Sequence, residues 1–115
     1  MQINLYNVRR KSYASVSQDE LHMTKVTPWG VGTLITLVFR DKGYALVTAD
    51  NRYLATDGSL EKSCSENTLF TIEFFSGNIA FKSKKDGRFV VSYSEKESSF
   101  YFYFELLKFY HFIKL

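Results

Sequence analysis

Three segments of the chain share the same alternation of apolar and polar positions. They are residues 35–39, 70–74 and 102–106, and in each the outer and middle positions are apolar. Alternation with a period of two predicts a β-strand with one buried face. Because the three strands recur at nearly constant spacing, we interpret the chain as three copies of one unit.

Each copy also begins in the same way, with an apolar strand, a polar turn and then an aromatic residue. The strands are residues 5–8, 44–48 and 79–81, the turns are residues 9–12, 49–52 and 82–88, and the aromatic residues are Tyr13, Tyr53 and Phe89. Asn and Asp-Gly in such turns supply the positive φ angles that tight hairpins require. The aromatic residues recur in register, which suggests that they belong to the core.

One unit of this kind cannot bury its own apolar face, whereas three units can close around a common axis. Closure also removes exposed sheet edges. We therefore predict an all-β protein folded as a single β-trefoil, with three hairpin-rich repeats at about residues 1–41, 42–76 and 77–107 and a divergent aromatic tail at residues 108–115. A β-sandwich is the main alternative, but it would leave the threefold repeat unexplained.

The third repeat is the shortest of the three. Phe104 follows Phe89 by 15 residues, whereas Ile72 follows Tyr53 by 19 residues. The apolar strand that completes the hairpin of the second repeat has no clear counterpart in residues 93–99. We therefore expect a shortened or missing hairpin in that part of the third repeat.

Length and composition fit one globular domain. The 115 residues are 45% hydrophobic and 23% charged, which is ordinary for a chain of this size. No apolar stretch is long enough to span a membrane. The single cysteine, Cys64, excludes an internal disulfide and fits a reducing compartment. Residues 106–115 place Phe109, Phe112 and Ile113 at helical spacing, which is compatible with a short C-terminal helix.

The chain offers little that would support catalysis. The histidines are His22 and His111, and Cys64 lies in a polar loop with no base placed to activate it. Two histidines and one cysteine that are far apart in sequence do not make a zinc site, and no glycine-rich phosphate loop is present. We therefore expect no enzyme activity, no catalytic residue, no metal site and no cofactor.

Basic turns are the best candidate for a functional site. The net charge is +3, which permits an acidic partner without requiring one. The candidate residues lie in the equivalent turns of the first and third repeats, and they are Arg9, Arg10, Lys11, Lys82, Lys84, Lys85 and Arg88. Equivalent turns of a threefold barrel lie around one pole, so both clusters would face one acidic surface. The alternative is that these side chains are simply solvated. A nucleic acid partner is not expected, because most aromatic residues occupy inward positions.

Several motifs of the chain resemble those of the fascin family. They are found at residues 4–14, 28–39, 50–60, 75–81 and 86–89, and the most specific is the Pro-Trp-Gly-Val segment at residues 28–31. Their order and spacing are similar to the second of the four trefoils of a fascin over residues 2–92, whereas residues 93–115 depart from that pattern. We expect Trp29 to pack across the barrel mouth or against a neighbouring trefoil.

Fascins are cytoplasmic proteins that cross-link actin filaments into parallel bundles. The resemblance therefore implies an actin-filament-binding module that forms part of a bundling activity in the cytoplasm and cytoskeleton. Its implied partners are actin filaments and flanking fascin trefoils. Two alternatives remain open, since one fold serves many functions. The first alternative is a trefoil that binds a ligand or glycan. The second is a truncated fragment with no independent function.

Overall fold

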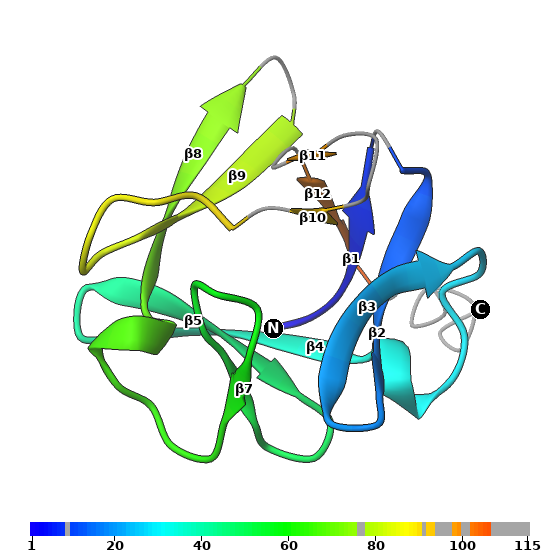
Figure 1. Ribbon diagram of the computed structural model, residues 1–115, viewed down its shortest axis with the longest axis horizontal. Helices are drawn as coiled ribbons and strands as arrows, with labels where there is room; N and C mark the ends of the chain where they lie inside the picture. The colour runs from blue at the N-terminus through cyan, green and yellow to red at the C-terminus, as the bar shows by residue number, and fades with distance from the viewer. Residues whose placement is uncertain (9, 76–77, 91, 94–97, 100–101, 107–115) are drawn as a thin grey trace, which may run out of the picture.

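The computed structural model describes residues 1–8, 10–75, 78–90, 92–93, 98–99 and 102–106, with side chains up to residue 90 apart from residue 75. The described part consists of strands and two short 3-10 helices (Figure 1). The elements are β1 (Gln2–Asn7), β2 (Ser12–Ser17), β3 (Glu20–Lys25), η1 (Val31–Thr33), β4 (Ile35–Arg40), β5 (Gly43–Thr48), β6 (Tyr53–Leu54), β7 (Leu60–Glu61), η2 (Glu66–Thr68), β8 (Phe70–Phe75), β9 (Asn78–Ser83), β10 (Ser92–Tyr93), β11 (Ser98–Ser99) and β12 (Phe102–Leu106). Neither 3-10 helix is long enough to cross a membrane.

Six of the strands close into a barrel. Antiparallel pairing runs from β1 through β4, β5, β8, β9 and β12, and then returns to β1. Within each repeat the first and last barrel strands meet at an equivalent pair, namely Ile3 with Ile35, Tyr44 with Phe70 and Ile79 with Phe102. Figure 1 shows the repeats spaced around a central axis. The predicted all-β trefoil is therefore confirmed.

A two-stranded hairpin belongs to each repeat beside the barrel. These hairpins are β2–β3, β6–β7 and β10–β11. The third repeat therefore keeps its hairpin, and of the predicted alternatives, a shortened or a missing hairpin, the missing one does not hold. The first two repeats insert η1 or η2 before their last barrel strand, whereas residues 100 and 101 alone separate β11 from β12.

A buried polar residue ends the first barrel strand of each repeat and holds the turn that follows. These residues are Asn7, Thr48 and Ser83, with exposed fractions of 0%, 3% and 3%. Each side-chain oxygen accepts a hydrogen bond from a backbone N–H of its turn, and the donors are Arg10, Arg52 and Lys85 at 3.0, 3.1 and 3.2 Å. Because the acceptors are buried, each bond satisfies a group that water cannot reach.

The same three turns share a backbone conformation. Lys11, Asn51 and Gly87 have φ angles of 56°, 63° and 75°. Their N–H groups donate to the backbone carbonyls of Asn7, Thr48 and Ser83, respectively. We call residues 8–11 the first turn, residues 49–52 the second turn and residues 84–88 the third turn. Since the three turns occupy equivalent positions about the barrel axis, they lie toward the same end of the barrel.

The core sits at the barrel axis and is built from equivalent positions of the repeats. Leu5, Leu46 and Phe81 are at most 2% exposed, and Phe70 and Phe81 contact edge to face at a centroid distance of 6.2 Å. Leu37 is buried and Ile72 packs against the core. The aromatic residues expected in the core, which are Tyr13, Tyr53 and Phe89, are only half-buried. The apolar residue that follows each of these aromatic residues belongs to the core instead, namely Ala14, Leu54 and Val90.

Trp29 does not pack across the barrel mouth, because its exposed fraction is 73%. The segment that carries it connects β3 to β4 and turns outward at Gly30, whose φ angle is 101°. Whether a neighbouring trefoil packs against Trp29, which was the other expectation, stays a prediction.

Two expectations concern residues or side chains that the structure does not describe, namely the C-terminal helix and the core position of Phe104. The predicted domain limits also stay predictions.

Candidate functional site

The first turn carries three of the predicted basic residues. Arg9 lies outside the described residues, Arg10 is half-buried and Lys11 is exposed. The positive φ angle of Lys11 follows from the tight geometry of this turn, in which the Lys11 N–H donates to the Asn7 carbonyl at 2.9 Å. The turn is therefore a well-defined scaffold for the cations that it presents.

Lys82 leads into the third turn from β9. Its ammonium lies 3.8 Å from a carboxylate oxygen of Glu73 on the neighbouring strand β8. It also lies 5.9 Å from the centroid of the Phe89 ring, which is within the range of a cation–π contact. These contacts hold Lys82 against the barrel wall, with Glu73 as a long-range ion-pair partner.

Lys84 and Lys85 reach across to other parts of the molecule. The Lys84 ammonium donates to the backbone carbonyls of Asp41 and Lys42 at 3.3 and 3.0 Å. The Lys85 ammonium donates to the Asn67 side-chain oxygen at 3.1 Å. Neither hydrogen bond involves a carboxylate, and both side chains stay exposed.

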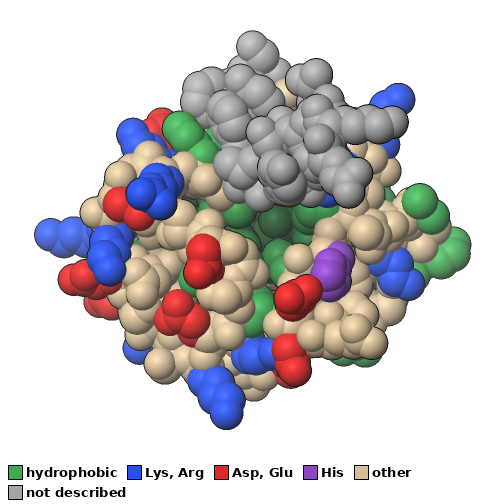
Figure 2. Space-filling model, in the orientation of Figure 1, with side chains coloured by type: hydrophobic (Ala, Val, Ile, Leu, Met, Phe, Trp, Pro, Cys, Tyr) green, Lys and Arg blue, Asp and Glu red, His purple; other side chains and the backbone are tan. Residues whose placement is uncertain are grey.

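The structure adds Lys42 to this basic cluster. Lys42 lies in the tight turn between β4 and β5, and Lys84 bonds to its carbonyl oxygen. Figure 2 shows several Lys and Arg side chains on the left edge of the face, where Figure 1 places this β4–β5 turn and the third turn. Alternation of apolar and polar residues predicts hairpins, but it does not reveal which hairpin ends lie close together. The sequence therefore did not predict that Lys42 belongs to this cluster.

Arg88 completes the third turn. Its side chain is 81% exposed, and its Nε atom lies 3.8 Å from a carboxylate oxygen of Asp86. The Asp86 carboxylate also accepts the Arg88 backbone N–H at 3.0 Å. We call Lys42, Lys84, Lys85 and Arg88 the basic edge. The first turn and the basic edge are separate clusters, placed at different points around the barrel (Figure 1).

The arginine of the second turn forms ion pairs within the molecule. The Arg52 guanidinium lies 2.8 Å from carboxylate oxygens of both Asp50 and Asp19, and its side chain is only 16% exposed. The Thr48 hydroxyl donates to the other Asp50 oxygen at 2.5 Å. This hydroxyl, and then the Arg52 side chain, hold the pKa of Asp50 below its ordinary value. Two neighbouring repeats are joined here, because Asp19 belongs to the hairpin of the first repeat.

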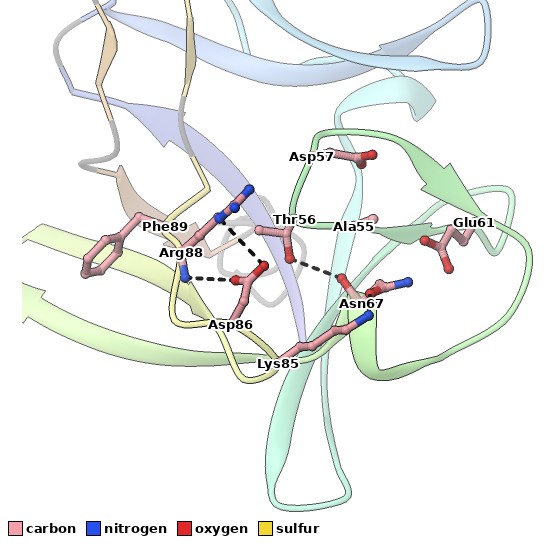
Figure 3. A pocket seen from close by; sticks show the side chains of 9 residues that line it. All are labelled: Ala55, Thr56, Asp57, Glu61, Asn67, Lys85, Asp86, Arg88 and Phe89. Carbon is pink, nitrogen blue, oxygen red and sulfur yellow. Dashed lines mark hydrogen bonds and ion pairs between the residues drawn. The ribbon is translucent and has the colours of Figure 1, made fainter.

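A pocket of about 290 Å³ lies between the hairpin of the second repeat and the third turn (Figure 3). Carboxylates and cations share its wall, and they come from Asp57, Glu61, Asp86, Lys85 and Arg88. The hydroxyl and N–H of Ser59 donate to Asp57 and lower the pKa of its carboxyl group. The mixed lining suits a ligand that both donates and accepts hydrogen bonds.

The described residues show no arrangement suited to catalysis. Cys64 is half-buried and accepts a hydrogen bond from the Thr68 hydroxyl at 3.6 Å. The Nε2 atom of His22 lies 3.5 Å from Glu20 on the surface of the hairpin of the first repeat. Within the same described part of the chain, no group of three or more His, Cys, Asp and Glu side chains could hold a metal ion.

Solved structures similar to this chain include β-trefoil lectins. The lectin SeviL, solved bound to asialo-GM1 saccharide, superposes with a TM-score of 0.78 at 10% identity, over 92% of this chain and 97% of SeviL. The Polyporus squamosus lectin superposes with a TM-score of 0.73 at 14% identity, over 92% of this chain and 49% of the lectin. At these identities the similarity shows the fold alone.

Sequence comparison is more specific. Fascin-2 of Bos taurus is 40% identical over 83 residues, which are 70% of this chain and 17% of that protein. Fascin-2 of Mus musculus is 37% identical over 91 residues, which are 77% of this chain and 18% of that protein. The chain thus spans less than a fifth of the length of these relatives. The family model of the fascin domain matches residues 3–106, and we conclude that the chain belongs to the fascin family.

Proposed function

We propose that this chain is an actin-filament-binding module of fascin type that works without enzymatic chemistry in the cytoplasm, as part of the cytoskeleton. The observation that carries the proposal is the basic edge, where the exposed ammonium groups of Lys84 and Lys85 donate to neutral oxygens, one of them the backbone carbonyl of Lys42. Family membership supports actin as the kind of partner.

The proposed binding depends on charge complementarity. An acidic filament surface attracts the cations of the first turn and the basic edge, which steers the encounter and fixes the orientation. Because such charges are screened beyond about 8–10 Å at physiological ionic strength, the affinity should fall as salt is added. The rigid turns reduce the entropy lost when these side chains meet the filament.

A single filament-binding site is not enough for bundling. A cross-link needs two sites on one particle, so that both filaments are held together. One trefoil supplies at most part of such an activity, which in the relatives belongs to chains more than five times as long as the matched segment. We therefore expect the isolated monomer to bind filaments weakly and not to bundle them.

Co-sedimentation with actin filaments tests the proposal. We would replace Arg9, Arg10, Lys84 and Lys85 with Glu together and measure pelleting at low salt. Binding should weaken at least tenfold, because the first turn would become negative and the basic edge would lose its net positive charge. Lys62→Glu is a single-charge control, since Lys62 is exposed and belongs to neither the first turn nor the basic edge. Unchanged pelleting of the fourfold variant would remove the hypothesis.

A second candidate function is glycan binding, which the pocket of Figure 3 favours. Its volume of about 290 Å³ is enough for one sugar ring. Carboxylates such as Asp57 would accept hydrogen bonds from sugar hydroxyls, and Arg88 would donate to them. A glycan array probed with the unmodified chain and with Asp57→Ala separates the two functions. A hit that Asp57→Ala abolishes would support the glycan function.

A further inference from the structure

The turn between β4 and β5 holds a lysine in an unfavourable backbone conformation. Its two loop residues are Asp41 and Lys42, and their φ angles are 50° and 63°. Two-residue hairpin loops of this kind favour Asn-Gly or Asp-Gly. Aspartate tolerates a positive φ angle, whereas lysine adopts it rarely. Residues held in such conformations cluster at functional sites, so Lys42 is a candidate for a functional role.

The hairpin β2–β3 provides an internal comparison. Its loop residues are Gln18 and Asp19, which also have positive φ angles, of 52° and 68°. The Asp19 side chain has a partner within the molecule, because its carboxylate lies 2.8 Å from the Arg52 guanidinium. Lys42 is exposed, and within the described part of the chain its ammonium makes no hydrogen bond or ion pair. An internal contact therefore accounts for Asp19 but not for Lys42.

Lys84 holds the backbone of this turn. Its ammonium donates to the carbonyl oxygens of both loop residues, Asp41 and Lys42, at 3.3 and 3.0 Å. The side chain passes close to Gly43, since a Cβ atom added there would lie 2.7 Å from the Lys84 Cδ atom. Because Gly43 has no side chain, the stem of Lys84 has room to reach both carbonyls. The turn is thus fixed by a residue that lies 42 positions beyond Lys42 in the sequence.

We propose that Lys42 contacts the acidic partner of the basic edge, and that Lys84 is a positioning residue that holds the β4–β5 turn in the conformation that presents Lys42. The proposal rests on the proposed filament-binding function and deepens it, because it assigns different roles to two lysines of one cluster. The charge of Lys84 still adds to the attraction of an acidic surface. Its main effect is to fix the turn before the partner arrives, so that less conformational entropy is lost on binding.

Gly43→Ala separates the position of Lys84 from its charge. The added methyl group takes the space of the Lys84 stem, which is flexible and can move aside, while every charge of the chain is kept. Lys84→Met is the second variant, since it keeps an unbranched stem and removes the ammonium group. We would measure the heteronuclear NOE of the Asp41 and Lys42 amides in the full chain without actin. Both variants should lower these values, because the turn loses two hydrogen bonds.

Co-sedimentation with actin filaments at low salt tests whether the two lysines are coupled. Lys42→Gln should weaken binding about threefold to fivefold, which is the upper range for one exposed ion pair. Gly43→Ala should weaken it about twofold to threefold although it changes no charge, because the turn must be ordered on binding. In the Lys42→Gln background Gly43→Ala should have no further effect, since it acts through Lys42.

Lys62→Gln is the matched control, because it removes an exposed charge outside the basic edge and should bind like the unmodified chain. Unchanged NOE values in both Gly43→Ala and Lys84→Met would overturn the role of Lys84, whether or not the chain binds actin. The role of Lys42 would be overturned by Lys42→Gln that pellets like the unmodified chain, or by equal effects of Gly43→Ala in the two backgrounds. An unmodified chain that does not pellet at all would remove the proposed function together with the Lys42 contact, whereas the NOE values would still decide the role of Lys84.

Discussion

The second and third turns occupy equivalent positions in the fold, but their cationic side chains contact different kinds of groups. Both follow a buried hydroxyl residue, Thr48 or Ser83, and both are closed by a hydrogen bond from the turn to that hydroxyl. In the second turn the guanidinium of Arg52, whose side chain is only 16% exposed, lies between two carboxylates. In the third turn the ammonium groups of Lys84 and Lys85 donate to neutral oxygens and stay exposed.

The difference shows that a positive residue in a turn is not by itself a binding site. Arg52 is committed to joining two repeats, so its charge is compensated and is of little use to a partner. Lys84 and Lys85 keep an uncompensated charge at the surface, which is what an acidic partner can use. The same backbone scaffold therefore supports a structural turn in one repeat and a candidate binding turn in another.

The largest expected effect on stability comes from the buried hydroxyl of the second turn. Thr48→Val removes the donor to Asp50 and the acceptor of the Arg52 N–H, and should destabilise the fold by about 2–3 kcal/mol. Ser83→Ala removes a single neutral contact and should cost about 1 kcal/mol. Urea unfolding of both variants gives the two values. Equal losses would contradict the distinction between the turns.

The next effect concerns the backbone of the third turn. Gly87 has a φ angle of 75°, so Gly87→Ala should destabilise the chain by about 1–2 kcal/mol. Gly87→Asn should cost less, because Asn tolerates this region and Asn51 already occupies the equivalent position of the second turn. Thermal unfolding compares the two variants, and an Asn variant that is less stable than the Ala variant would count against the equivalence of the turns.

We expect Arg52 of the second turn to contribute to stability and Arg88 of the third turn to contribute nothing measurable. Arg52→Met leaves Asp50 and Asp19 without their common partner and should lower the melting temperature, by less than Thr48→Val does. Arg88→Met should leave it unchanged, since Arg88 is 81% exposed and its ion pair is long. Calorimetry measures both variants. A loss of stability in Arg88→Met would show that the third turn is also a structural clamp.

The smallest expected effect is a dependence on pH. Because the pKa of Asp50 is lowered in the folded chain, its contribution to stability is present above the unfolded pKa of about 3.9 and is lost as the pH falls through the folded pKa. Asp50→Asn should therefore flatten the decrease in stability below about pH 4. Denaturation curves from pH 3 to 7 check this, and an unchanged decrease would point to other carboxylates.

The architecture was predictable from sequence because its signals are local and repeated. Alternating strands and equivalent turns predicted the closed barrel, and the hairpin order then placed the first and third turns in equivalent positions. The packing of particular side chains was less predictable. Trp29 was expected to be covered, but Gly30 turns the connection outward, and Thr33 fixes that conformation through contacts that no periodicity reveals.

The candidate site was predictable in part for the same reason. The basic residues of the first and third turns stand out in the sequence, but their surroundings depend on contacts between distant segments. Lys84 reaches the turn at Lys42, and Arg52 reaches Asp19 across 33 residues. Neither contact has a sequence signal, so the sequence alone did not show that Lys42 joins the basic edge or that Arg52 is compensated.

The most direct test of the account is to compare two folded variants in one actin co-sedimentation experiment at low salt. Lys85→Glu combined with Arg88→Glu reverses exposed charges of the third turn, and Arg52→Gln removes a compensated charge of the second turn. We predict that the first variant binds filaments about tenfold more weakly, equivalent to about 1.4 kcal/mol, and that the second binds like the unmodified chain. Equal binding by all three chains, or a loss confined to Arg52→Gln, would contradict the account.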